Sequence, residues 1–249
     1  MDYIPSTGAF PSTKDLRTFT YPLGAVAPKI GGERYKLEDI TDQSKVGICV
    51  AASLVQNANK ATGKQYSADF LYLIIKKFID KNWNEGSSIF SALKTAKAYG
   101  LLPAEEWTHT TQADRDLGYA YYIEKLKVVP EDEIQRLLLK TDKIIKAYAG
   151  VPVNRDSLAR AINESKAGIL VRYDVVQEWW TAPSGQLSWN KKDIEPLRKP
   201  KVVVSGHAVT QSNFDGGSFR IANTWGPEWS DNGTAYHLLT DYRPTEAFV

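Results

Sequence analysis

The most informative segment of this chain is Asp42-Gln43-Ser44-Lys45-Val46-Gly47-Ile48-Cys49-Val50-Ala51-Ala52. It contains the single cysteine of the sequence, Cys49, and a glutamine, Gln43, six residues before it. Apolar residues recur with a helical period from Cys49 to about Lys60, so Cys49 is expected at the N-terminus of a helix. There the helix dipole and the free N–H groups favour a thiolate. The segment therefore offers a candidate nucleophile, with the Gln43 side chain and the Cys49 backbone N–H as candidate oxyanion donors.

Two downstream segments carry the groups that a cysteine nucleophile needs. Gly206-His207-Ala208-Val209 supplies an imidazole, and Ile221-Ala222-Asn223-Thr224-Trp225-Gly226 supplies a carboxamide. His207 would take the thiol proton, and Asn223 would accept a hydrogen bond from one ring nitrogen so that the other faces the sulfur. Trp225 is expected to cover that hydrogen bond and keep water out of the site. The three segments predict a Cys-His-Asn catalytic apparatus.

Composition and charge describe an ordinary globular protein. The 249 residues are 43% hydrophobic and 24% charged, and a net charge of +2 gives no reason to expect nucleic acid or an anionic membrane as partner. No apolar run approaches the roughly 18 residues that span a bilayer. The N-terminus lacks the pattern of a secretory signal, and one cysteine cannot form an intramolecular disulfide, so a cytoplasmic or non-classically delivered protein is favoured. The one cysteine and three histidines have no metal-ligand spacing, so neither a metal nor another cofactor is expected.

Hydrophobic periodicity divides the chain into three parts of an α+β protein. Residues 1–36 read as an extended arm, 37–150 as a mainly helical lobe with the nucleophile, and 151–249 as a β-rich lobe with His207 and Asn223. The positions that mark helix starts are Cys49, Ser67, Ser87 or Ser88, Pro130 and Asp156. Strands are expected at 169–175, 202–204, 207–211, 218–223 and 235–239, with a surface loop at 181–200.

The whole pattern resembles the papain-like cysteine peptidases, in particular their bacterial-like branch. Residues 91–100 look like the family's helix beyond its substrate-binding glycines, and 223–233 look like its asparagine–tryptophan segment. Residues 3–19 are similar to the N-terminal arm of some bacterial members. The resemblance implies a two-lobed fold with the active-site cleft between the lobes. It also implies hydrolysis of peptide bonds in a peptide or protein substrate through a thioester acyl-enzyme, without a cofactor.

The same resemblance assigns residues to substrate binding. At the family's glycine pair the chain has Gly86-Ser87, and Ser87 keeps the backbone groups for strand-like pairing with a peptide. Ile89 and Ala208 would line the pocket for the side chain two residues before the scissile bond, so an apolar residue is expected there. Trp225 joins this substrate-binding set. The N-terminal arm could cover the cleft, which the sequence by itself does not show.

Other interpretations of these residues remain open. The family's usual Cys-Gly-Ser-Cys-Trp reads Val46-Gly47-Ile48-Cys49-Val50 here, which removes half of a disulfide and a packing tryptophan. A lone cysteine is often a small buried hydrophobe, His207 could be a core histidine, and residues 223–226 could be an ordinary turn. The same three groups could also serve an acyltransferase. Finally, the fold could be a catalytically inactive peptide-binding module.

Overall fold

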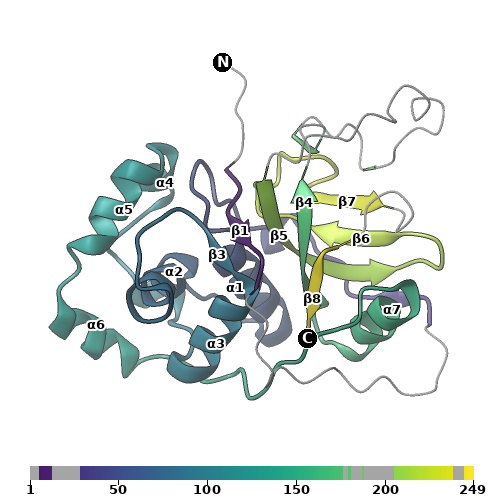
Figure 1. Cartoon of the computed structure of the whole chain (residues 1–249), viewed down its shortest axis with the longest axis horizontal. Coiled ribbons are helices and arrows are strands. Elements are labelled where there is room, and N and C mark those ends of the chain that lie inside the picture. Colours follow the sequence, from purple (N-terminus) through teal and green to yellow (C-terminus); the bar gives the residue numbers. More distant parts are fainter. Residues whose placement is uncertain (1–5, 13–28, 176–178, 181–186, 188–204, 238–243) are drawn as a thin grey trace.

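The computed structural model describes residues 6–12, 29–175, 179–180, 187, 205–237 and 244–249. A group of helices stands beside an antiparallel sheet, and the strand β1 near the N-terminus runs between them (Figure 1). The described helices are α1 (Cys49–Thr62), α2 (Ala68–Ile74), the π-helical turn η2 (Ile75–Asp80), α3 (Ile89–Tyr99), α4 (Gln112–Asp116), α5 (Tyr119–Lys127), α6 (Glu131–Leu138) and α7 (Arg155–Glu164), with 3-10 turns η1 (Leu37–Asp39) and η3 (Ala104–Glu106). The described strands are β1 (Ala9–Phe10), β2 (Gly31–Gly32), β3 (Ser87–Ser88), β4 (Ile169–Val175), β5 (Ser205–Phe214), β6 (Phe219–Ala222), β7 (Thr234–His237) and β8 (Glu246–Phe248). This arrangement confirms the expected α+β class.

Helix α1 is the central element of the helical half. Its residues from Cys49 to Val55 are all buried, and it contacts α2, α3 and the sheet strand β5. It ends at Gly63, whose left-handed φ of 72° suits a residue without a Cβ. Because α1 touches both halves, it lies where helices and sheet meet.

The larger sheet has the strand order β7-β6-β5-β4-β8, with β2 added beside β5, and all its pairings are antiparallel. In the register, Arg172 of β4 lies opposite both Ala208 of β5 and Glu246 of β8. Cross-strand neighbours share one face of a sheet. A separate two-stranded parallel ribbon joins β1 to β3.

Two groups of buried apolar side chains stabilise the molecule. One lies among the helices and includes Ala9, Ile89 and Ala208, and the other lies between α7 and the sheet and includes Trp225. Burial of apolar area contributes roughly 25 cal/mol per Å², so these clusters supply most of the favourable free energy of folding. The proposed division at residue 150 stays a prediction.

Helix starts agree with the sequence in most places and differ in one. Ser67 and Ser88 act as N-caps, with side chains that accept hydrogen bonds from Phe70 N and Ser91 N. Asp156, however, is not the cap of α7: Asn154 is, since its side chain accepts from Ser157 N and the helix begins at Arg155. The sequence did not indicate α4, α5 or the strands β1, β2, β3 and β8. Residues 202–204 and 238–239, and 181–200 apart from Leu187, lie outside the described residues.

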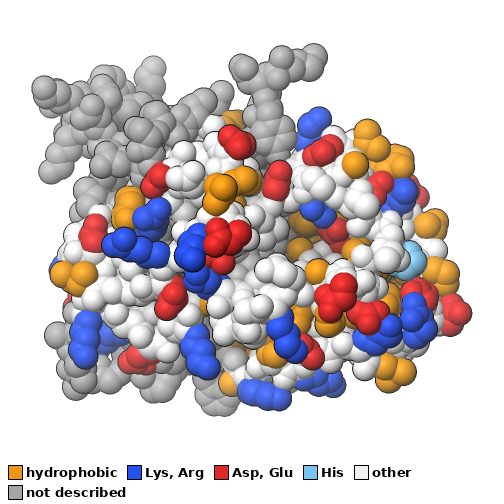
Figure 2. Space-filling model, turned by 180° about the vertical axis from the view of Figure 1, so that it is seen from behind, with side chains coloured by type: hydrophobic (Ala, Val, Ile, Leu, Met, Phe, Trp, Pro, Cys, Tyr) orange, Lys and Arg blue, Asp and Glu red, His pale blue; other side chains and the backbone are white. Residues whose placement is uncertain are grey.

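The surface of the described residues mixes the two signs of charge. Figure 2 shows lysine and arginine side chains interspersed with acidic ones over the face opposite to that of Figure 1. Within the described part of the chain, no helix has the length and apolar character needed to cross a membrane.

Candidate active site

Cys49 is the first residue of α1, and its side chain is fully buried. Burial raises the pKa of the Cys49 thiol to about 11, while hydrogen bonds from the backbone of Ala208 and of Gly8 act in the opposite direction. Ala208 directly follows His207 in β5, so this contact brings the start of β5 against the thiol. In this arrangement the thiol is protonated at neutral pH.

The His207 ring is oriented by Asn223, with Nε2 and Oδ1 2.7 Å apart. The same Oδ1 atom accepts a hydrogen bond from Thr224 N at 2.7 Å, which requires that it be the amide oxygen. An oxygen acceptor requires that His207 Nε2 carry the hydrogen, which leaves the lone pair on Nδ1. Among the described residues, buried Nδ1 has no hydrogen-bond partner. Nδ1 therefore has a free lone pair, and the role of His207 as a base stays a prediction.

Trp225 covers the histidine. The two rings stack with centroids 4.5 Å apart, and both residues are buried. This burial lowers the pKa of His207 to about 4, against the hydrogen bond to Asn223, which raises it. Both the imidazole and the Cys49 thiol are thus neutral in this arrangement.

Gln43 is fully buried and its carboxamide is fixed at both ends. Its Nε2 donates to Val46 O at 2.9 Å and to Ser6 O at 2.8 Å. Its Oε1 accepts from Thr224 Oγ1 at 2.5 Å. The amide hydrogens of Gln43 consequently point at the peptide carbonyls of Ser6 and Val46, and the role of Gln43 as an oxyanion donor stays a prediction. The sequence interpretation missed Thr224, although a hydroxyl directly after the candidate asparagine was a visible signal.

The Ser6 carbonyl belongs to the N-terminal arm, whose residues 6–12 run through the site. Ser6 O also accepts from Trp225 Nε1 at 3.2 Å, and Gly8 N donates to Gly206 O at 3.1 Å. Ser87 N donates to Gly8 O at 2.7 Å, next to the parallel pairing of β1 with β3. The backbone of Ser87 therefore binds an extended segment of the arm, and the expected role of Gly86-Ser87 in substrate binding stays a prediction.

The arm approaches the walls of the site too closely for a side chain at Gly8. A Cβ built on Gly8 would lie 2.5 Å from Gly47 O and 2.9 Å from Gly86 Cα. A Cβ on Gly86 would likewise lie 2.3 Å from Gly8 O. Both glycines are required by close backbone approach.

Three charged side chains hold the arm, and none was singled out from the sequence. The Glu85 carboxylate accepts from Ser6 Oγ at 2.7 Å and from Gly47 N at 2.6 Å. Arg172 Nε donates to Ala9 O at 2.9 Å, and Glu246 accepts from both N and Oγ of Ser12 at 2.6 Å.

Ile89 and Ala208, the expected lining of an apolar pocket, are buried in the same cluster as Ala9 of the arm. The sheet register places Arg172 directly opposite Ala208, with Glu246 opposite Arg172 on its other side. Sequence reasoning missed these charges because the pairing of β4 with β8 cannot be read from the chain. No group of three or more potential metal ligands from His, Cys, Asp and Glu occurs among the described residues.

This combination of a helical half, an antiparallel half and a cysteine at a helix N-terminus near a sheet histidine is the papain-like fold. Among solved structures, the chain is similar to xylellain, a cysteine protease from Xylella fastidiosa, with a TM-score of 0.77 and 20% identity over 100% of this chain and 97% of that one. It is also similar to procathepsin B S9 from Trypanosoma congolense, with a TM-score of 0.62 and 14% identity over 98% and 85% of the two chains. Digestive procathepsin L 3 of the Tenebrio molitor larval midgut matches with a TM-score of 0.61 and 14% identity over 93% and 72%. No protein-family model and no curated protein sequence matches the chain.

Proposed function

We propose that this chain is a papain-like cysteine peptidase whose N-terminal arm occupies the substrate site in the resting state. The observation that carries the proposal is the hydrogen bond from Gln43 Nε2 to Ser6 O, at the N-terminal end of the helix that begins with Cys49. In the proposed complex, the reacting carbonyl of a substrate takes the position that the Ser6 carbonyl holds here. The hydrogen bond from Ser87 N to Gly8 O supports the same mode of binding for the neighbouring backbone of a substrate peptide.

The proposed reaction uses four side chains and water. His207 Nδ1 takes the thiol proton, and the Cys49 thiolate attacks the carbonyl carbon of the scissile bond. Gln43 Nε2 and the Cys49 backbone N–H stabilise the oxyanion, and Asn223 keeps the His207 ring in place. The C–N bond breaks as His207 gives its proton to the leaving amine, which leaves a thioester. Water, deprotonated by His207, then hydrolyses the thioester to a carboxylic acid and restores the thiol.

The arm keeps this apparatus inactive in the proposed resting state. The arm occupies the hydrogen-bond donor of Gln43 and buries Cys49 and His207, so that the thiol and the imidazole stay neutral. Displacement of the arm would admit water, which lowers the pKa of the thiol and raises the pKa of the imidazole. The thiolate–imidazolium pair then becomes accessible.

Substitution Gly8→Ala tests the proposal, because its Cβ would collide with Gly47 O without changing any group of the apparatus. Overpacking of this kind costs about 1–3 kcal/mol, which corresponds to about five- to 150-fold more of the arm-displaced form. Hydrolysis of a fluorogenic peptide mixture should rise by that factor in Gly8→Ala. It should stay at the parental level in Thr7→Ala, the matched control, and vanish in Gly8→Ala/Cys49→Ala.

Two outcomes of this assay would oppose the proposal. If Cys49 of Gly8→Ala becomes open to alkylation but no peptide is cleaved, the fold serves as a peptide-binding module. If an added amine captures the acyl group in preference to water, the chain is an acyltransferase with the same groups.

A further inference from the structure

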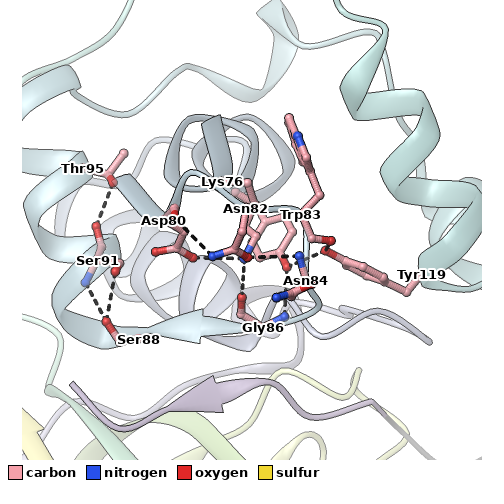
Figure 3. Close-up of polar contacts among 11 residues, drawn as sticks. Lys76, Asp80, Asn82, Trp83, Asn84, Gly86, Ser88, Ser91, Thr95 and Tyr119 are labelled. Carbon is pink, nitrogen blue, oxygen red and sulfur yellow. Dashed lines mark hydrogen bonds and ion pairs between the residues drawn. The ribbon is translucent and has the colours of Figure 1, made fainter. Parts of the chain in front are cut away.

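A lysine is fully buried beneath the segment that binds the arm. The Lys76 side chain lies in the π-helical turn η2 and has no exposed surface. Its ammonium donates to Gly86 O at 2.8 Å, to Asp80 Oδ2 at 3.0 Å and to Asn82 Oδ1 at 3.2 Å (Figure 3). An ammonium has three hydrogens, so each one has a partner.

The backbone N–H of Gly86 is also held by a side chain. Gly86 N donates to Tyr72 Oη at 3.0 Å, and Tyr72 Oη lies 3.2 Å from Tyr119 Oη. Tyr119 Oη in turn donates to Trp83 O at 3.0 Å. The Lys76 ammonium lies 5.6 Å from the centre of the Tyr72 ring, which links the two contacts. Both backbone polar groups of Gly86 are thus fixed to α2 and η2.

This anchorage lies one residue from the peptide-binding group. Ser87 N, which donates to Gly8 O, directly follows the Gly86 carbonyl that Lys76 holds. The chain has one cysteine, so no intramolecular disulfide can fix this segment. Packing alone does not explain the lysine, because burial of a charge is unfavourable and a methionine of similar length would fill the space. Burial accordingly lowers the pKa of Lys76, while Asp80 raises it.

We propose that Lys76 is a positioning residue for peptide binding, which holds β3 through the Gly86 carbonyl so that Ser87 N–H meets the backbone of a bound peptide. The arm is that peptide in the resting state. The extension to substrates rests on the peptidase function proposed above.

Hydrogen exchange of the full chain tests the proposal without any assay of activity. In Lys76→Met, exchange of the Gly86 and Ser87 amides should accelerate about tenfold, the effect of losing a hydrogen bond to a charged group. Lys77→Met is the matched control, because Lys77 is the next residue of η2 but pairs with Glu131 at the surface. It should leave these amides unchanged. Unchanged exchange of the Gly86 and Ser87 amides in Lys76→Met would overturn the proposal.

Kinetics in the Gly8→Ala background separate positioning from general structural damage. Lys76→Met should raise KM about tenfold for a peptide that reaches β3. Hydrolysis of p-nitrophenyl acetate, whose two-carbon acyl group cannot extend to Ser87, should stay within about twofold. Equal losses for both substrates would contradict a positioning role.

A second variant covers the case in which Lys76→Met does not fold. Tyr72→Phe removes only the hydroxyl that accepts from Gly86 N, and it should change exchange and KM in the same direction. If these exchange effects occur but no ester or peptide is hydrolysed by Gly8→Ala, the peptidase proposal fails while the role of Lys76 stands. If neither variant changes exchange, the role of Lys76 fails independently.

Discussion

At the scale of single residues, two neighbours in the chain orient two different groups of the site. Asn223 Oδ1 holds the His207 ring, and Thr224 Oγ1 holds the Gln43 carboxamide. The turn that carries them thus orients both the proposed base and the proposed oxyanion donor. A shift of this one turn would disturb both steps of the proposed reaction.

Thr224→Val isolates the second of these contacts, because it keeps the shape of the side chain and removes its hydroxyl. Loss of an oxyanion donor typically lowers the rate on the order of 10²–10³-fold, and a misoriented Gln43 should give about tenfold in kcat. The rate of iodoacetamide reaction at Cys49 should not change, because alkylation forms no oxyanion. Both rates are measured in the Gly8→Ala background. A parallel fall of the two would show that Thr224 acts on the thiol instead.

At the scale of elements, local chemistry explains what the sequence predicted and what it did not. Ser67 and Ser88 were predictable caps, since a hydroxyl that reaches an N–H three residues on is a local feature. At the start of α7 two residues could serve, and only the structure shows that Asn154 rather than Asp156 reaches the free N–H. The helical structure of α1, with Cys49 as its first residue, was predictable from hydrophobic periodicity.

Contacts between distant parts of the chain could not be predicted in this way. The resemblance pointed to Cys49, His207, Asn223 and Gln43, and the structure brings these four into one site, although their catalytic roles remain proposals. The pairing of β1 with β3, and the approach of Arg172 and Glu246 to the arm, depend on sheet register. Lys76 gave no signal either, because charged residues on helices usually face water.

At the scale of the whole molecule, the closed arrangement makes stability depend on pH. The pKa of His207 is lowered to about 4 in the folded chain by burial, so the unfolded chain binds the proton more readily. This contribution is fully present above the unfolded pKa of about 6.5 and is lost as the pH falls toward 4. Between pH 6.5 and 4.5, the free energy of unfolding should fall by about 2–3 kcal/mol.

Denaturant unfolding at these two pH values measures the effect. A His207→Asn variant is the reference, because it lacks the titrating ring and should show a much smaller fall over the same interval. An equal fall in both proteins would place the proton uptake elsewhere and would remove the link between acid and the closed arrangement.

The central claim is that His207 activates Cys49 once the arm leaves the site. The most direct measurement is the rate at pH 6 at which a peptide-like, thiol-directed epoxide adds to Gly8→Ala, followed by intact mass beside Gly8→Ala/His207→Ala. An unassisted thiol with a pKa of about 8.5 is almost wholly protonated at that pH and reacts slowly. The account predicts fast formation of a single adduct on Cys49 in Gly8→Ala and its loss in the double variant. Equal rates in the two proteins would contradict it.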